Sequence, residues 1–417
     1  MVHQKELYKQ AAATIATSIC RDAIWKGTRC NWIGTSSEDW YGMPRGYAKA
    51  LGTSFYDGTS GIAFFLLQLR RVHSNPLLDK TLRGALEQVI SVEGDRQKNA
   101  SDAILGFHAG LAGCAYVLHL AGELLGEERY QKAATQFIDC ICNLPEETWG
   151  LDVIDGPAGA IPVLQFLYKK QPGEALRQFI LRLAAYLIRK ADKQTPGWSW
   201  ETVPDRYHNL TGYGHGAAGF ATAFAELYAF TGDEQYLQIA RSVVGYEDSH
   251  FVSGQQNWPD YRRFDQEYGV EKAVAEPACS IAWCHGAPGI GLSRLRIFEL
   301  TKDPQARQDA EIALQTTRKN LHLDVLGNYS LCHGLFGNAE LLLYAADVFN
   351  RPQLRSEAEQ VADACIQEFL DKKVPVPNGL QLPAETPDFM LGSSGIGYFF
   401  LRVLDPGMFP SVLVFRS

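Results

Sequence analysis

The chain has 417 residues and a formal net charge of −8, and this acidic balance argues against a nucleic-acid partner. Hydrophobic residues make up 46% of it, which is ample for a core, yet no apolar run reaches the roughly 20 residues that span a membrane. The stretch from Ala11 to Cys20 is too short and polar for a signal peptide. The odd number of cysteines, nine, is typical of reduced thiols. We therefore expect a cytoplasmic protein that is not integral to a membrane.

Residues 1–50 are expected to form a helical lead-in, after which seven Gly-x-x-Gly pairs each open an apolar, helix-like run. Glycines at i and i+3 share one helical face and let another backbone come close. Neighbouring pairs are separated by about the length of two helices, so the repeat sets the architecture. The pairs are Gly58/Gly61, Gly110/Gly113, Gly156/Gly159, Gly216/Gly219, Gly286/Gly289, Gly334/Gly337 and Gly392/Gly395.

A second helical segment lies between successive pairs, and several of these segments begin with acidic residues or proline, as at Glu127 and Pro304. The glycine-led helices are apolar nearly all round and suit an inner layer, whereas their amphipathic partners suit an outer one. The last repeat, from Leu391, lacks the polar capping face that an open solenoid needs. We therefore predict an all-α fold, an α/α toroid of seven inner and seven outer helices. It should form one domain over residues 1–417, with a surface insertion at 245–278.

Chemistry-bearing residues stand just before several first glycines, and parallel inner helices would gather them at one end of the ring. Singly, such residues are usually caps or core. Two Cys-His-Gly triplets in neighbouring repeats are a stronger signal, because two thiolates and an imidazole suit zinc and leave a fourth position open for water or substrate. A structural zinc would instead take His285 or His215 as its fourth ligand. The residues are Asp155, His215, Cys284, His285, Cys332 and His333.

Three of these motifs resemble signatures of the lanthionine synthetase C-like (LanC) family: Trp283-Cys-His-Gly-Ala-Pro-Gly, Leu331-Cys-His-Gly and Gly212-Tyr-Gly-His-Gly-Ala-Ala-Gly. From about residue 30 onward, the chain is most similar to the cyclase half of class II lanthipeptide synthetases. The resemblance implies an α/α toroid with zinc held by Cys284, Cys332 and His333. It implies a catalytic His215 paired with Asp155, and a substrate pocket that includes Tyr213, Trp283 and His285.

Two positions depart from nisin-type cyclases: Ser280 replaces an arginine and His285 replaces a tyrosine.

The resemblance implies that cysteine thiols add to dehydroalanine or dehydrobutyrine in a dehydrated precursor peptide and close thioether rings. The chain is too short to include a dehydratase, so a separate dehydratase is an expected partner. The helix dipole favours a neutral His215 that acts as a base, unless the aspartate outweighs it.

Three alternatives remain open at this level. A related enzyme could add glutathione to dehydrated residues in proteins. A glycoside hydrolase on the same fold could use Asp57 and Asp155 as its two carboxylates, which would leave Cys284, Cys332 and His333 idle. A non-catalytic scaffold could hold a structural zinc.

Overall fold

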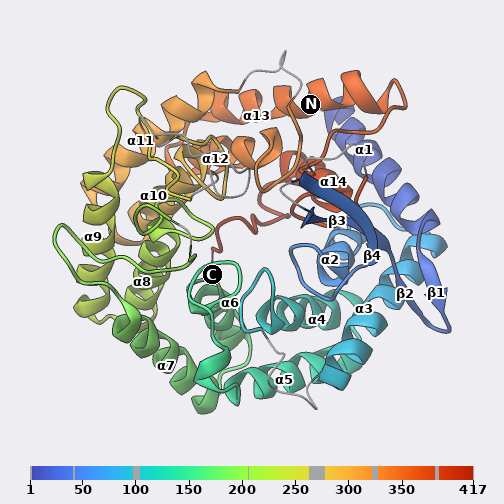
Figure 1. Cartoon of the computed structure of the whole chain (residues 1–417). Helices are drawn as coiled ribbons and strands as arrows, with labels where there is room; N and C mark the ends of the chain where they lie inside the picture. The colour runs from blue at the N-terminus through green and yellow to red at the C-terminus, as the bar shows by residue number, and fades with distance from the viewer. Residues whose placement is uncertain are drawn as a thin grey trace.

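The helices form two concentric rings (Figure 1). The structure, a computed structural model, describes residues 2–40, 43–96, 104–204, 206–262, 278–321, 327–380 and 385–416. No helix in these ranges combines the length and apolarity needed to cross a bilayer. Seven largely buried helices in these ranges form the inner ring: α2 (Thr59–Arg70), α4 (Leu111–Leu125), α6 (Pro157–Lys170), α8 (Ala217–Thr231), α10 (Ala287–Thr301), α12 (Leu335–Val348) and α14 (Ser393–Leu404).

The outer ring consists of amphipathic helices that bury one face against the inner ring. In α5, for example, Tyr130, Phe137 and Ile141 are buried while Arg129 and Lys132 face water. Two short turns, η2 (Glu146–Thr148) and η3 (Ile366–Leu370), follow α5 and α13. The described outer helices are α1 (Val2–Arg21), α3 (Pro76–Arg96), α5 (Glu128–Cys142), α7 (Glu174–Lys190), α9 (Glu234–Ser249), α11 (Pro304–Lys319) and α13 (Pro352–Cys365).

The ring closes where the last inner helix meets the first. Helix α14 packs against α2, and the backbone N–H of Met390 donates to the carbonyl of Tyr56 at 2.9 Å. Helix α1 covers α14 from outside, and the Tyr8 hydroxyl donates to Asp363 of α13 at 2.9 Å. The predicted α/α toroid is thus confirmed, and its seventh outer helix comes from the start of the chain.

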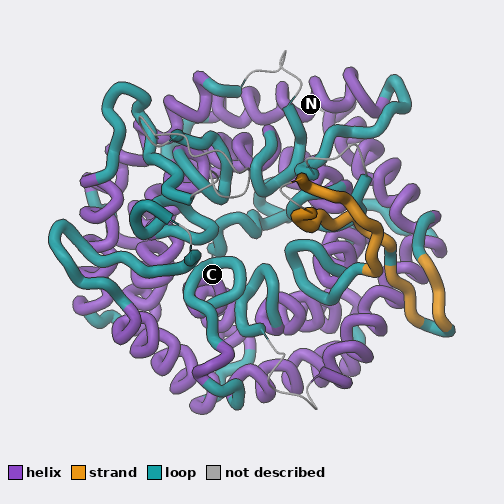
Figure 2. The backbone as a smooth tube through the Cα atoms, in the orientation of Figure 1, coloured by secondary structure: helices purple, strands orange, loops and turns teal. Residues whose placement is uncertain are grey.

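The lead-in is helical only as far as Arg21, so the expectation of a helical segment over residues 1–50 is met in part. Two antiparallel hairpins follow (Figure 2), and Gly27 takes a left-handed backbone (φ +63°) in the tight turn of the first. The buried indole of Trp32 donates to the carbonyl of Ile19 at 2.7 Å and ties the hairpins to α1. The paired strands are β1 (Ile24–Lys26) with β2 (Arg29–Asn31) and β3 (Ile33–Trp40) with β4 (Met43–Ala50).

Each glycine pair folds a loop back onto the first turn of its inner helix. The first glycine is the residue that precedes the helix, and the second lies one turn inside it. A Cβ atom on the second glycine would lie only 1.8 Å (Gly289, Gly395) to 2.5 Å (Gly219) from the carbonyl oxygen six residues earlier in all seven repeats. The close approach that the glycines permit is therefore made by the helix's own loop.

Main-chain hydrogen bonds join these loops around the whole ring. We call the residues two before each first glycine the rim positions; they are Tyr56, His108, Ile154, Gly214, Cys284, Cys332 and Met390. Each loop donates from a rim position, or from a direct neighbour of one, to the carbonyl of the next rim position. The seven N···O distances are 2.8 to 3.4 Å: Tyr56 to His108, Ala109 to Ile154, Val153 to Gly214, Gly214 to Cys284, Cys284 to Cys332, Cys332 to Met390 and Met390 to Tyr56.

Buried ion pairs hold neighbouring inner helices together further along their length. Arg296 of α10 binds Glu226 of α8 at 2.5 Å, and Arg402 of α14 binds Glu340 of α12 at 2.7 Å. All four side chains are almost fully buried, so each guanidinium depends on its carboxylate. The inner ring is therefore joined by main-chain bonds at its loop end and by charge pairs beyond it.

Substituting alanine for Gly395 should destabilise the fold, because the new methyl group would meet the carbonyl oxygen of Phe389 at 1.8 Å. We expect a loss of about 1–3 kcal/mol or more in the free energy of unfolding, measured by urea denaturation. Gly254→Ala is the control, since a Cβ atom there meets nothing within 4 Å. Equal stability of the two variants would contradict the fold-back role of the second glycine.

Candidate functional site

Two thiols meet at the loop end of the ring. Cys284 and Cys332 occupy adjacent rim positions, and their backbones are linked by the N–H of Cys284. A hydrogen bond between the thiols lowers the pKa of Cys284, and the nearby charge of Arg262 lowers it further against the effect of burial. The same contact, together with burial, raises the pKa of Cys332. The pair therefore favours one thiolate that is stabilised by a neighbouring thiol.

A tight loop presents Cys284 and His285 at the start of α10. A bridge between Ile281 and Gly286 closes the loop, and the N–H of Ala282 donates to the carbonyl of His285 at 3.1 Å. Gly286 has a left-handed φ of +90°, and a Cβ atom there would meet the carbonyl oxygen of Ser280 at 1.8 Å. Only glycine fits this position, which explains why the triplet ends in glycine here.

His333 is oriented by a backbone carbonyl. Its Nε2 lies 2.8 Å from the oxygen of Gly379. A carbonyl can only accept, so Nε2 carries the proton and Nδ1 keeps the lone pair that a metal would need. Two contacting thiols and an oriented imidazole fit zinc by donor type. As placed, however, no three His, Cys, Asp or Glu side chains in the described ranges are grouped closely enough to hold a metal ion.

His215 is paired with Asp152, not with Asp155 as predicted. Nδ1 of His215 lies 2.6 Å from Oδ2 of Asp152, a buried carboxylate whose Oδ1 accepts from the N–H groups of Ile154 and Asp155. Burial alone would lower the pKa of His215, but the hydrogen bond and charge of Asp152 outweigh it and raise the pKa. The structure therefore favours a protonated imidazole, whereas the dipole argument favoured a neutral one.

Asp155 lies beside this pair and not within it. Desolvation and the neighbouring Asp152 carboxylate raise the pKa of Asp155 to about 7, although its side chain reaches solvent. The sequence placed Asp155 correctly at the loop end, directly before Gly156. Its catalytic role stays a prediction.

The three residues predicted to line a substrate pocket are buried under the site. Trp283 is 0% exposed and Tyr213 5%, with their ring centroids 5.6 Å apart. His285 stacks near His215 at 6.1 Å, and neither of its ring nitrogens has a hydrogen-bond partner of normal geometry in the described ranges. Burial lowers the pKa of His285 to about 3. Their contact with a substrate stays a prediction.

Sequence reasoning gave no role to two further groups at the thiols. The Tyr56 hydroxyl hydrogen-bonds to the Cys332 thiol, and Tyr56 occupies a rim position, so alignment of the repeats could have found it. Arg262 comes from the stretch expected to be a surface insertion, and it binds the buried carboxylate of Asp260 at 2.6 Å. No sequence motif identifies Arg262 as a site residue. Residues 263–277 of the insertion lie outside the described residues.

This combination of a closed helical ring and a rim thiol pair can be compared with known proteins. The family model of the lanthionine synthetase C-like proteins matches residues 49–414. The chain belongs to this family.

Relatives of this LanC-like chain include two proteins of Lactococcus lactis subsp. lactis. The lacticin 481/lactococcin biosynthesis protein LcnDR2 is 25% identical over 353 residues, which are 79% of this chain. The chain spans only about a third of that relative, 34% of its length. The nisin biosynthesis protein NisC is 23% identical over 76% of this chain and 79% of its own length.

Two solved structures resemble this LanC-like chain in fold. Nisin cyclase superposes with a TM-score of 0.65 at 18% identity, covering 87% of this chain and 90% of that one. A GH76 α-mannanase of Bacteroides thetaiotaomicron superposes with a TM-score of 0.52 at 11% identity, covering 95% of both chains. At these identities the likeness concerns the fold alone.

Asp152→Asn should lower the pKa of His215, because burial then acts without the opposing carboxylate. An NMR titration of the His215 ring in metal-stripped protein measures this. Since the folded-state pKa is raised, the pair stabilises the fold fully below the unfolded pKa and ceases to do so as pH rises through the folded value. The stability difference between parent and variant should shrink over that window. Asp155→Asn is the control. A larger shift of the His215 pKa in that variant would support the predicted pairing of His215 with Asp155 instead.

Proposed function

We propose that the chain is a zinc-dependent lanthipeptide cyclase that adds cysteine thiols to dehydroalanine or dehydrobutyrine in a precursor peptide. The observation that carries the proposal is the contact between Cys284 and Cys332, with the His215–Asp152 pair beside it. The charge of Cys284 raises the pKa of His215, which supports a nucleophile and a proton donor that act at one site. The family relationship supports the same reading.

Cys284, Cys332 and His333 would hold the zinc ion, with His333 binding through Nδ1. Bound there, zinc would keep a substrate thiol deprotonated at neutral pH, where a free thiol is mostly protonated. The carbonyl of Gly379 fixes the orientation of the imidazole by accepting a hydrogen bond from its other nitrogen, Nε2. In this proposal the metal ligands are two sulfur donors and one nitrogen donor, a set that suits zinc.

His215 acts as the general acid in this proposal. The peptide thiol releases its proton to solvent, and its sulfur forms a bond to the β-carbon. The electrons of the carbon–carbon double bond move onto the α-carbon and its carbonyl as an enolate. The α-carbon then takes a proton from Nε2 of His215, because Nδ1 is engaged by Asp152. The raised pKa of His215 favours the charged ring that donates this proton, and the ring regains a proton from solvent afterwards.

The remaining assignments are part of the same proposal. The substrate would be a precursor peptide already dehydrated by a separate dehydratase, and the enzyme would work in the cytoplasm as a single LanC-like domain over residues 1–417. Its substrate cysteine is part of the same molecule as the electrophile. The high effective concentration of that thiol favours ring closure over addition of an external thiol.

Zinc analysis tests the metal assignment. Purified protein should contain about one zinc ion per chain, and Cys284→Ala with Cys332→Ala should lose it while circular dichroism keeps the helical signal. Cys114→Ala is the control, because this buried thiol in α4 contacts Ser60 away from the pair. Full zinc retention in the double variant would refute the ligand set.

Cyclisation of a dehydrated, cysteine-containing peptide tests the reaction. Ring closure leaves the peptide mass unchanged and removes alkylatable thiols, which mass spectrometry counts after alkylation. His215→Asn should slow this loss by about 10²- to 10⁴-fold, the usual contribution of a general acid, while zinc stays bound. A variant as fast as the parent would move proton transfer to another residue.

The same assay with glutathione present separates the alternatives. An enzyme-dependent glutathione adduct, with peptide cysteines still free, would show that the chain joins an external thiol instead of closing rings. Zinc binding without either product would indicate a scaffold. Loss of peptide thiols without a mass change supports the cyclase.

A further inference from the structure

The segment 405–416, which follows the last inner helix, enters the centre of the ring (Figure 1). Val412, Leu413 and Val414 are 3%, 1% and 1% exposed, so this part of the segment is as buried as the inner helices. Neither the glycine repeat nor the Cys-His-Gly motifs account for it.

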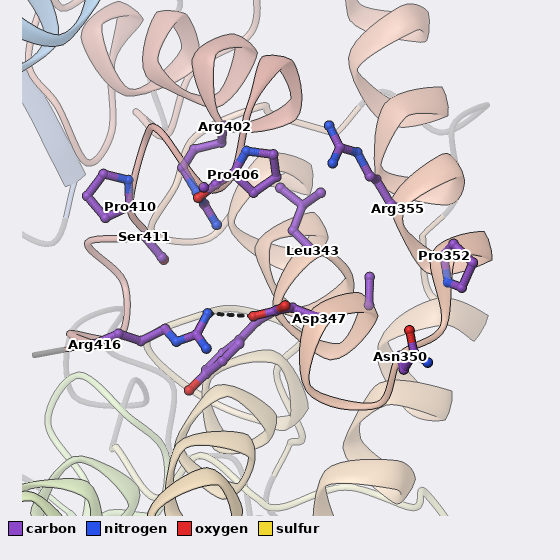
Figure 3. A pocket seen from close by; sticks show the side chains of 13 residues that line it. Leu343, Asp347, Asn350, Pro352, Arg355, Arg402, Pro406, Pro410, Ser411 and Arg416 are labelled. Atoms are coloured by element: carbon purple, nitrogen blue, oxygen red, sulfur yellow. Dashed lines mark hydrogen bonds and ion pairs between the residues drawn. The ribbon is translucent and has the colours of Figure 1, made fainter. Parts of the chain in front are cut away.

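The two ends of the segment are anchored by arginines. Arg402, buried at the end of α14, donates to the carbonyls of Pro406 (3.1 Å) and Phe409. Arg416 binds Asp347 at 2.8 Å and also Glu299. Figure 3 shows Arg402, Arg416 and Asp347 around a cavity of about 530 Å³ where α12 and α14 end. Both ends of the segment are therefore fixed by charged groups of the ring.

Close to its end, the segment is packed against aromatic rings of two inner-helix repeats, those of α4 and α6. The ring of Phe415 lies 5.4 Å from Phe107, 5.1 Å from Tyr116 and 5.9 Å from Phe166. Just before it, the carbonyl of Leu413 accepts a hydrogen bond of 2.9 Å from the indole N–H of Trp283. The segment thus connects the ion pairs at the ends of α12 and α14 with Trp283, the residue next to Cys284.

Trp283 is the residue through which this contact reaches the site. It is fully buried, lies 5.1 Å from the ring of His108, and directly precedes Cys284 in the tight loop. Without the carbonyl of Leu413, the buried indole N–H of Trp283 would lose this hydrogen bond, which is energetically unfavourable. The bond therefore favours one position of the indole. Fixing Trp283 fixes the backbone from which the Cys284 thiol projects.

We propose that the segment 405–416 is an internal strut that positions the Cys284 thiol through Trp283. Trp283 is then a positioning residue, since it acts through Cys284 and does not touch the reacting atoms. The effect on turnover rests on the proposed cyclase function. The effect on the thiol itself does not.

Trp283→Phe tests the strut, because it keeps an aromatic ring but removes the N–H donor. We expect kcat for cyclisation to fall about 3- to 10-fold with KM little changed, the size of effect of one net hydrogen bond. In metal-stripped protein without substrate, iodoacetamide should alkylate Cys284 about 3-fold faster or more, as followed by peptide mass spectrometry. Trp32→Phe is the matched control: it loses the same kind of buried indole–carbonyl bond, at 2.7 Å, far from the thiols, and should change neither rate.

A second variant addresses the strut from its other side. Phe415→Leu loosens the aromatic packing and should reproduce both effects, also if Trp283→Phe folds poorly. The two substitutions should be non-additive, with the double variant no worse than the worse single one, because they break the same connection. Unchanged Cys284 alkylation in both single variants, or effects that multiply, would overturn the proposal. Faster alkylation in an enzyme that makes no thioether would support the strut and refute the cyclase.

Discussion

The circle of seven main-chain hydrogen bonds is the constraint on which the rest of this structure depends. It fixes the rim positions relative to one another through N–H and C=O groups, which every non-proline residue carries. The side chains at these positions can therefore differ without disturbing the frame. Five of the seven residues are neither Cys284 nor Cys332, and the site is the place where the two rim cysteines lie side by side. The α-mannanase with the same fold illustrates that such a ring is not tied to one chemistry.

Opposed electrostatic effects define the site more than any single residue. Burial acts to lower the pKa of His215, and the neighbouring Asp152 carboxylate outweighs this effect and raises the pKa. Contact between the thiols makes one of them easier to deprotonate at the expense of the other. Arg262 adds a positive charge that is itself held by Asp260. An anionic thiolate and a cationic imidazole stabilise each other in partly buried surroundings, and this suits the sulfur chemistry proposed for the site.

Much of this arrangement was predictable because the repeat is periodic. Equivalent places before each glycine pair predicted the toroid and brought Cys284 and Cys332 together. The error at Asp155 has a physical cause: Asp152 stands three residues earlier, and only the fold-back of the loop brings it to His215. Arg262 was unpredictable because it arrives from an insertion with no counterpart in other repeats. The hairpins of residues 24–50 were missed because short strands lack a long periodic pattern.

The pairing of α1 with α14 has a consequence for how the chain folds as it is made. Tyr8 of α1 meets Asp363 of α13, 355 positions later. At ordinary translation rates that stretch takes roughly 20 to 70 s to emerge from a ribosome. For that interval the apolar face of α1, with Ala12, Ile15 and Ile19, has no covering partner among the late helices. Until the late helices are made, the incomplete ring therefore exposes the apolar face of α1. Chaperone binding would matter most in this state.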